Sequence, residues 1–68
     1  MTGRVFKIKK GLVSLVLEDG HSCWFQPLGG YDIEVDDIVT GDMWSLGREE
    51  FFNATKGYEM NVFVQGHT

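Results

Sequence analysis

The sequence predicts an all-β fold: a single domain over residues 1–68 that forms a small five-stranded antiparallel β-barrel. The first observation is alternation with a period of two in short segments rich in Val, Ile, Phe, Trp and Thr. These segments are residues 4–10, 12–18, 21–26, 37–44, 49–54 and 58–65. The second is that nine glycines spread along the chain interrupt any long helix. Closing the sheet into a barrel hides the edges that an open sheet exposes.

The first hairpin, LVSLVLEDGHSCWFQ at residues 12–26, has two possible registers. A two-residue loop of Asp19-Gly20 mixes polar and apolar residues on both faces. A three-residue loop, Glu18-Asp19-Gly20, sets Val13 opposite Phe25 and Leu15 opposite Cys23. One face then carries Val13, Leu15, Leu17, Cys23 and Phe25, and the other carries Leu12, Ser14, Val16, Ser22, Trp24 and Gln26. A slip of one residue exchanges the faces, so we expect the three-residue loop, with Trp24 pointing away from the core.

A three-residue loop is also expected in the last hairpin. A loop of Thr55-Lys56-Gly57 sets Phe52 opposite Met60, which predicts that Phe52 faces the core and that Phe51 faces outward. The core face of the final segment then carries Met60, Val62 and Val64, and Phe63 faces outward.

Between the hairpins, we expect Val39 and Met43 to face inward, with a bend at Gly41 between them and Trp44 on the outer side. Pro27 is expected to end the third strand, because its missing N–H does least damage there. The segment PLGGYDIEV at residues 27–35 is predicted to be the least regular part of the chain.

The charge distribution bears directly on possible partners. The chain carries ten acids and six bases, for a net charge of −4. Four of the six bases, Arg4, Lys7, Lys9 and Lys10, lie in the first ten residues. Five acids and no base lie between Asp32 and Asp42, and we interpret these acids as a solvated connection. Strong, general binding to phosphate is therefore not expected, but the first strand can provide a small basic patch.

The sequence offers little for catalysis, metal binding or membrane insertion. No apolar run reaches membrane-spanning length, and we expect no signal peptide because charges interrupt the apolar residues of the first eleven positions. Cys23 is the only cysteine, which excludes an internal disulfide and fits a cytoplasmic location. His21 and Cys23 are too few ligands for a zinc site, and we interpret Cys23 as a small core residue. No nucleophile, base and oxyanion site converge, so we expect no enzyme activity, no cofactor and no metal.

The order of the motifs resembles the S1-like branch of the OB-fold over roughly residues 3 to 43. Residues 3–8, GRVFKI, match the Gly-x-Val-x-x-Ile that opens S1 domains, and KGLVSLVLEDG follows as the glycine-led second strand. VDDIV at residues 35–39 is similar to the later Gly-Asp-x-Val, with Asp36 in place of the glycine. Leu12 and Val13 stand where RNA-binding S1 domains usually carry aromatics. An SH3-like barrel is the structural alternative.

Two functional hypotheses follow, both for a binding module. The S1-like resemblance implies a face that binds single-stranded RNA or DNA. Aromatic rings on this face would stack on nucleobases, and the basic side chains of the first strand would contact phosphates. The alternative is a protein-interaction or assembly module, including a homodimer, that uses the same exposed aromatics. The candidate residues for either role are Arg4, Lys7, Lys9, Lys10, Trp24, Trp44, Phe51 and Phe63.

Overall fold

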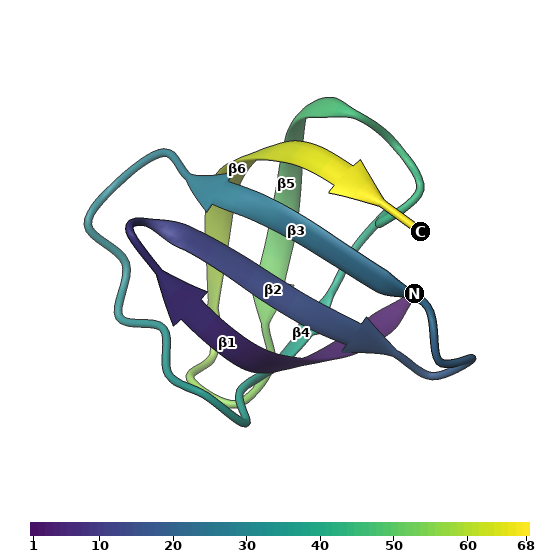
Figure 1. Cartoon of the computed structure of the whole chain (residues 1–68). Helices are drawn as coiled ribbons and strands as arrows, with labels where there is room; N and C mark the ends of the chain where they lie inside the picture. The colour runs from purple at the N-terminus through teal and green to yellow at the C-terminus, as the bar shows by residue number, and fades with distance from the viewer.

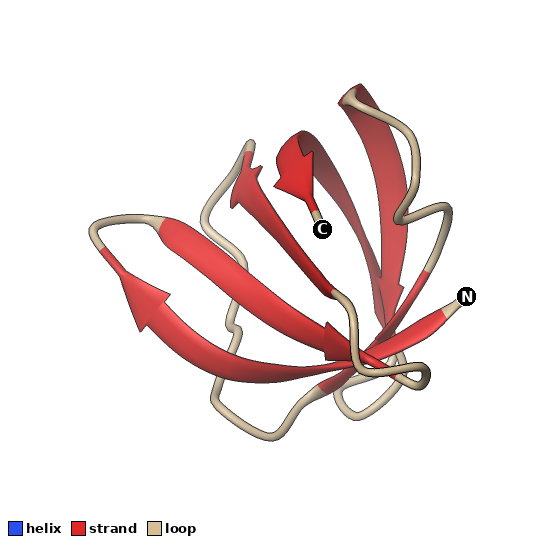
Figure 2. Ribbon diagram, turned by 45° about the vertical axis from the view of Figure 1, so that its right-hand side comes forward, coloured by secondary structure: helices blue, strands red, loops and turns tan.

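The computed structural model describes residues 1–68 and contains six strands and no helix (Figures 1 and 2). The strands are β1 (Thr2–Lys9), β2 (Leu12–Leu17), β3 (Ser22–Pro27), β4 (Ile38–Thr40), β5 (Gly47–Asn53) and β6 (Tyr58–His67). They form a closed antiparallel barrel in the order β1-β2-β3-β6-β5-β4, with β4 pairing back to β1. The predicted all-β barrel is confirmed.

The strand count differs from the prediction. Two meanders, β1-β2-β3 and β4-β5-β6, are joined through β3–β6 and β1–β4, and every neighbouring pair is antiparallel. A closed ring in which neighbours alternate in direction needs an even number of strands. The predicted five strands therefore become six, because β4 and β5 form separate strands that pair with each other.

The first hairpin has the predicted register. Val13 pairs with Phe25, Ser14 with Trp24 and Leu15 with Cys23, and the Leu17 N–H donates to the His21 carbonyl (2.7 Å) across the three-residue loop. The predicted core face of this hairpin is buried throughout. Pro27 ends β3, and the connection from residue 28 to residue 37 has no regular structure, as expected.

The core contains twelve buried apolar side chains and centres on an edge-to-face contact of Phe25 with Phe51, whose ring centroids are 5.3 Å apart. Val39 and Met43 are buried on either side of a bend at Gly41, as predicted. A Cβ on Gly41 would lie 2.4 Å from Cδ1 of Phe51. Glycine is therefore required where the chain bends over this ring.

The prediction for the last hairpin is wrong by one residue. Phe51 pairs with Met60 and is fully buried, whereas Phe52 pairs with Glu59 and is 41% exposed. The turn has four residues, Ala54–Gly57, and the Gly57 N–H donates to the Asn53 carbonyl (2.7 Å). Asn53 is buried, and its place in the core brings Phe51 inward.

Asp37 is the reason that Asn53 is buried. Asp37 is 3% exposed, and its carboxylate accepts hydrogen bonds from the Asn53 side chain (2.9 Å) and the Glu34 N–H (3.0 Å), with Lys56 Nζ 3.2 Å away. Its backbone carbonyl accepts from the Val5 N–H of β1 (2.9 Å). The predicted solvated acidic connection is thus wrong for Asp37, which ties the 28–37 connection to β1 and to the β5–β6 turn.

A matched pair of variants tests the register of the last hairpin. Phe51→Leu leaves a gap in the core, and we expect it to lower the free energy of unfolding by about 1 to 3 kcal/mol. Phe52→Leu changes an exposed side chain, and we expect a change within about 0.5 kcal/mol. Urea denaturation measures both, and equal losses would contradict the register.

The stability should also depend on the charge of Asp37. Burial alone raises the pKa of Asp37, but the hydrogen bonds from Asn53, Glu34 and Lys56 outweigh it, so the pKa lies below the ordinary 3.8. A lowered pKa stabilises the fold above the ordinary value, and this contribution is lost as the pH falls through the folded-state pKa.

We expect Asp37→Asn to lower the free energy of unfolding by about 1.5 to 3 kcal/mol at neutral pH. The reason is that the carboxylate that accepts hydrogen bonds from Asn53, Glu34 and Lys56 becomes a neutral amide. The difference in the free energy of unfolding between wild type and Asp37→Asn should shrink as the pH falls below 3.8. Urea denaturation at a series of pH values measures it. A difference that does not vary with pH would show that the charge of Asp37 is unimportant.

Candidate functional site

The β1–β2 hairpin places three lysines on the outside of the barrel. Lys7 pairs with Ser14 and Lys9 with Leu12, and Lys10-Gly11 is the two-residue loop between the strands. A β-bulge between Val5 and Lys7 shifts the ladder by one residue. Alternate residues of a strand face the same side, so without the bulge Phe6 and Ile8 would face outward like Arg4. The bulge shifts this alternation by one residue and turns Lys7 and Lys9 outward.

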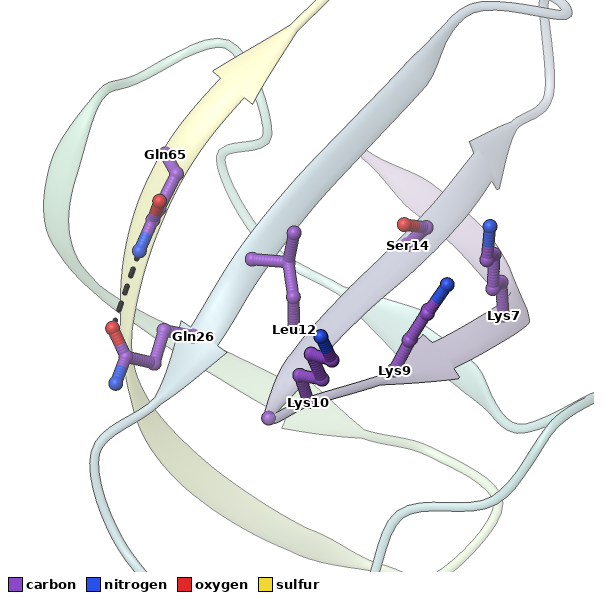
Figure 3. A pocket seen from close by; sticks show the side chains of 8 residues that line it. Lys7, Lys9, Lys10, Leu12, Ser14, Gln26 and Gln65 are labelled. Atoms are coloured by element: carbon purple, nitrogen blue, oxygen red, sulfur yellow. Dashed lines mark hydrogen bonds between the residues drawn. The ribbon is translucent and has the colours of Figure 1, made fainter.

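These lysines form one side of an open groove of about 470 Å³ on the outer surface of β1, β2, β3 and β6 (Figure 3). Leu12 and Ser14 of β2 lie in the middle of the groove, and Gln26 of β3 and Gln65 of β6 lie on the side opposite the lysines. We call this site the lysine groove; its residues are Lys7, Lys9, Lys10, Gly11, Leu12, Ser14, Gln26 and Gln65.

The lysine groove is positively charged although the protein is acidic. None of the ten carboxylates lines it, and Lys7, Lys9 and Lys10 take part in none of the four ion pairs in the structure. Arg4 and Lys56, by contrast, are neutralised by Asp36 (3.0 Å) and by Glu34 and Asp37 (2.7 and 3.2 Å). The groove therefore presents three cationic groups that have no internal counter-charge.

Gln26 and Gln65 face each other across β3 and β6. The Gln65 amide donates to Oε1 of Gln26 at 3.2 Å (Figure 3). This bond leaves the Gln26 NH₂ as a free donor and the Gln65 carbonyl as a free acceptor. The wall opposite the lysines is therefore polar and uncharged, and it can hydrogen-bond to a ligand.

Trp24 lies outside the core, as predicted, and borders the lysine groove. It pairs with Ser14 on one side and with Gly66 of β6 on the other. A Cβ on Gly66 would lie 2.5 Å from Cζ2 of Trp24, so the indole rests directly on the glycine backbone. The ring is half-buried, with part of its surface open to the outside.

Phe63 and Arg48 continue the same outer surface beyond Gln26. Gln26 pairs with Phe63, and Phe63 pairs with Arg48 of β5. Directly paired residues of an antiparallel sheet lie on one face, so these three side chains adjoin. Phe63 is 43% exposed, as predicted, and Arg48 is exposed without an ion-pair partner.

The remaining predicted site residues lie elsewhere. Arg4 is exposed and paired with Asp36, beside a second hollow of about 300 Å³ that does not include the three lysines. Trp44 is exposed at one end of the barrel, with His21 and His67 edge-on at 5.4 and 5.0 Å. Phe51 is a correction: it is part of the core and is not available to any ligand.

Trp44 is held over the barrel end by its own loop. Asp42 accepts hydrogen bonds from the Ser45 hydroxyl (2.9 Å) and the Trp44 N–H (3.2 Å), and these bonds lower the pKa of Asp42. Trp44 does not line the lysine groove, so the structure does not bring all predicted aromatics together.

Cys23 is a small core residue, as predicted. It is fully buried, and burial raises the pKa of its thiol to about 11. The neutral thiol is then the dominant form at neutral pH, which is the unreactive state of cysteine. No group of three or more His, Cys, Asp or Glu side chains converges as a metal site.

Sequence reasoning missed Gln65 and Arg48 as site residues. The parity that placed Phe63 outside also places Gln65 outside, so this signal was present in the sequence. Arg48 precedes the segment predicted as a strand, and β5 begins at Gly47. Its position beside Phe63 depends on the true register of β5 with β6, which the four-residue turn sets.

Comparison with protein families, curated proteins and solved structures finds no match to this chain. The structure contains no helix that is long and apolar enough to cross a bilayer.

Lys10 occupies a backbone position that is unfavourable for lysine. Its φ is 52° and that of Gly11 is 77°, as in a type I′ turn, where Asn, Asp or Gly is preferred at the first position. We expect Lys10→Asn to raise the free energy of unfolding by up to about 1 kcal/mol. Thermal and urea denaturation test this expectation, and a loss of stability would contradict it.

Proposed function

We propose that this barrel is a non-enzymatic binding module that binds single-stranded RNA or DNA, weakly, on the outer face of β1, β2 and β3. The observation that carries the proposal is the lysine groove: three cations without counter-charges converge on one depression that no acid lines. A strand of phosphates would supply the missing counter-charge and release bound cations from the nucleic acid.

The position of Lys10 supports a functional use of its charge. Lysine in the left-handed region is less favourable than asparagine or glycine, and residues kept in such conformations concentrate at functional sites. At this position, the side chain joins Lys7 and Lys9 at the groove. Lys10→Asn should therefore raise the free energy of unfolding and at the same time weaken the binding of nucleic acid.

A single strand fits this surface better than a duplex. Trp24 borders the groove through Ser14, and Phe63 borders it through Gln26, so an aromatic ring is available at each flank. Rings of this kind stack on bases only when the bases are not already stacked and paired in a helix. The free amide groups of Gln26 and Gln65 add hydrogen bonds to base edges.

The resemblance to S1-like OB-fold domains agrees with this proposal. Asp36 stands where the S1 pattern has glycine, and its φ of 79° lies in the region that glycine favours. The barrel has six strands rather than five, so the resemblance extends to a small antiparallel barrel with this motif order. We place the protein in the cytoplasm, where the lone thiol of Cys23 stays reduced.

The net charge of −4 sets the strength of binding. Phosphate is repelled by the molecule as a whole and attracted only near the groove, so affinity should be low and should fall steeply with salt. The competing function is a protein-interaction module, including a homodimer, and exposed Phe6 and Ile8 on β1 favour it.

The test is a titration with a short 5′-phosphorylated oligothymidylate of about three nucleotides, which carries three phosphates, that follows tryptophan emission at several salt concentrations. Three phosphate contacts predict that log K falls with log salt with a slope of about −2, at about −0.7 per contact. Lys9→Gln and Lys10→Asn should each weaken binding and reduce the slope by about 0.7.

Arg4→Gln is the matched control, because it changes the net charge equally but lies outside the groove and is paired with Asp36. It should leave the slope unchanged. Absence of binding at low salt would overturn the proposal. Sedimentation as a dimer that Phe63→Ala converts to a monomer would favour the protein-interaction function instead.

A further inference from the structure

We infer that the single strand leaves the lysine groove across β3 and β6, passes over Phe63 and reaches a second phosphate site at Arg48 on β5. This inference rests on the proposed function and adds the path of the ligand and its far contact. Arg48 was not among the residues that the sequence singled out.

The path follows one row of side chains across five neighbouring strands. Lys9 pairs with Leu12, and the register of Val13 with Phe25 continues to set Leu12 opposite Gln26. Gln26 pairs with Phe63, and Phe63 with Arg48. We call Lys9, Leu12, Gln26, Phe63 and Arg48 the cross-strand row. Because the barrel is closed, this row follows its curved outer surface for four of the six steps around the ring, about 19 Å, which is enough for several nucleotides.

The two ends of the cross-strand row are cationic, and its middle is neutral. Arg48 is exposed, and none of the ion pairs in the structure includes it. A free guanidinium binds a phosphate with two parallel hydrogen bonds. Phosphates are therefore favoured at Lys9 and at Arg48, and the neutral middle is left for bases.

Phe63 is placed to hold a base between these two ends. Its ring is 43% exposed, and both of its cross-strand neighbours, Gln26 and Arg48, are polar. The free NH₂ of Gln26 and the free carbonyl of Gln65 lie next to it and can meet a donor and an acceptor on one base edge. A ligand without bases gains neither stacking nor these hydrogen bonds.

Carboxylates limit how far the ligand extends along β5 and β6. Glu50 lies two residues beyond Arg48 on the same face of β5, and the neighbouring side chain of Glu59 on β6 raises the pKa of Glu50. At neutral pH this pair repels phosphate. Arg48 is thus the last favourable contact on this side of the barrel.

The experiment compares two lengths of oligothymidylate, about three and about eight nucleotides, on wild-type protein and on Arg48→Gln. Only the longer one can reach Arg48 from the lysine groove. We expect Arg48→Gln to weaken the longer ligand several-fold and to reduce its salt slope by about 0.7, with no change for the shorter one. An abasic strand of the longer length should lose the contribution of Phe63 and bind more weakly than oligothymidylate.

Arg4→Gln is again the control of equal charge, and it should affect neither length beyond a small common shift. The path is overturned if Arg48→Gln behaves like Arg4→Gln on the longer ligand while the lysine variants still weaken both. That result would leave the proposed function intact. If no ligand binds wild type at low salt, or if the lysine variants have no effect, the proposed function itself fails.

Discussion

The buried carboxylate of Asp37 is the constraint on which the rest of the structure depends. It holds the Asn53 side chain inside the barrel, and Asn53 fixes the four-residue turn that sets β5 against β6. That register buries Phe51 against Phe25 and places Arg48 beside Phe63 on the outside. The backbone of Asp36 and Asp37 also binds Val5, which closes the barrel beside β4. Core and surface therefore depend on one polar contact.

Internal ion pairing determines which cations are available to a ligand. Lys56 is occupied by Glu34 and Asp37, and Arg4 by Asp36, so the 34–37 segment neutralises two of the six bases. The four remaining bases, Lys7, Lys9, Lys10 and Arg48, all lie in the lysine groove or at the end of the cross-strand row. An acidic protein thus has its unpaired bases in the lysine groove and at the far end of the cross-strand row, and a phosphate-bearing partner would supply their missing counter-charge.

Sequence patterning predicted the parts of the fold that depend on alternation alone. In the first hairpin only one register gathers the polar residues Ser14, Ser22 and Gln26 on the same face, and the outward position of Trp24 followed. At Phe51-Phe52 the two candidate positions carry the same residue, and hydrophobicity cannot choose between them. The choice is made by Asn53 and Asp37, which contact each other only in the folded barrel. The same non-local contact places Arg48, and so this part of the site was missed.

The most direct test of the central claim is an NMR titration of uniformly ¹⁵N-labelled wild-type protein with oligothymidylate at low salt. We expect the amide shifts to concentrate on the lysine groove and the cross-strand row, and the 31–37 segment and the barrel end at Trp44 to stay unchanged. The residues expected to shift are Lys7, Lys9, Lys10, Gly11, Leu12, Ser14, Trp24, Gln26, Phe63, Gln65 and Arg48. Shifts centred on Trp44 and Leu46, or no shifts at all, would contradict it.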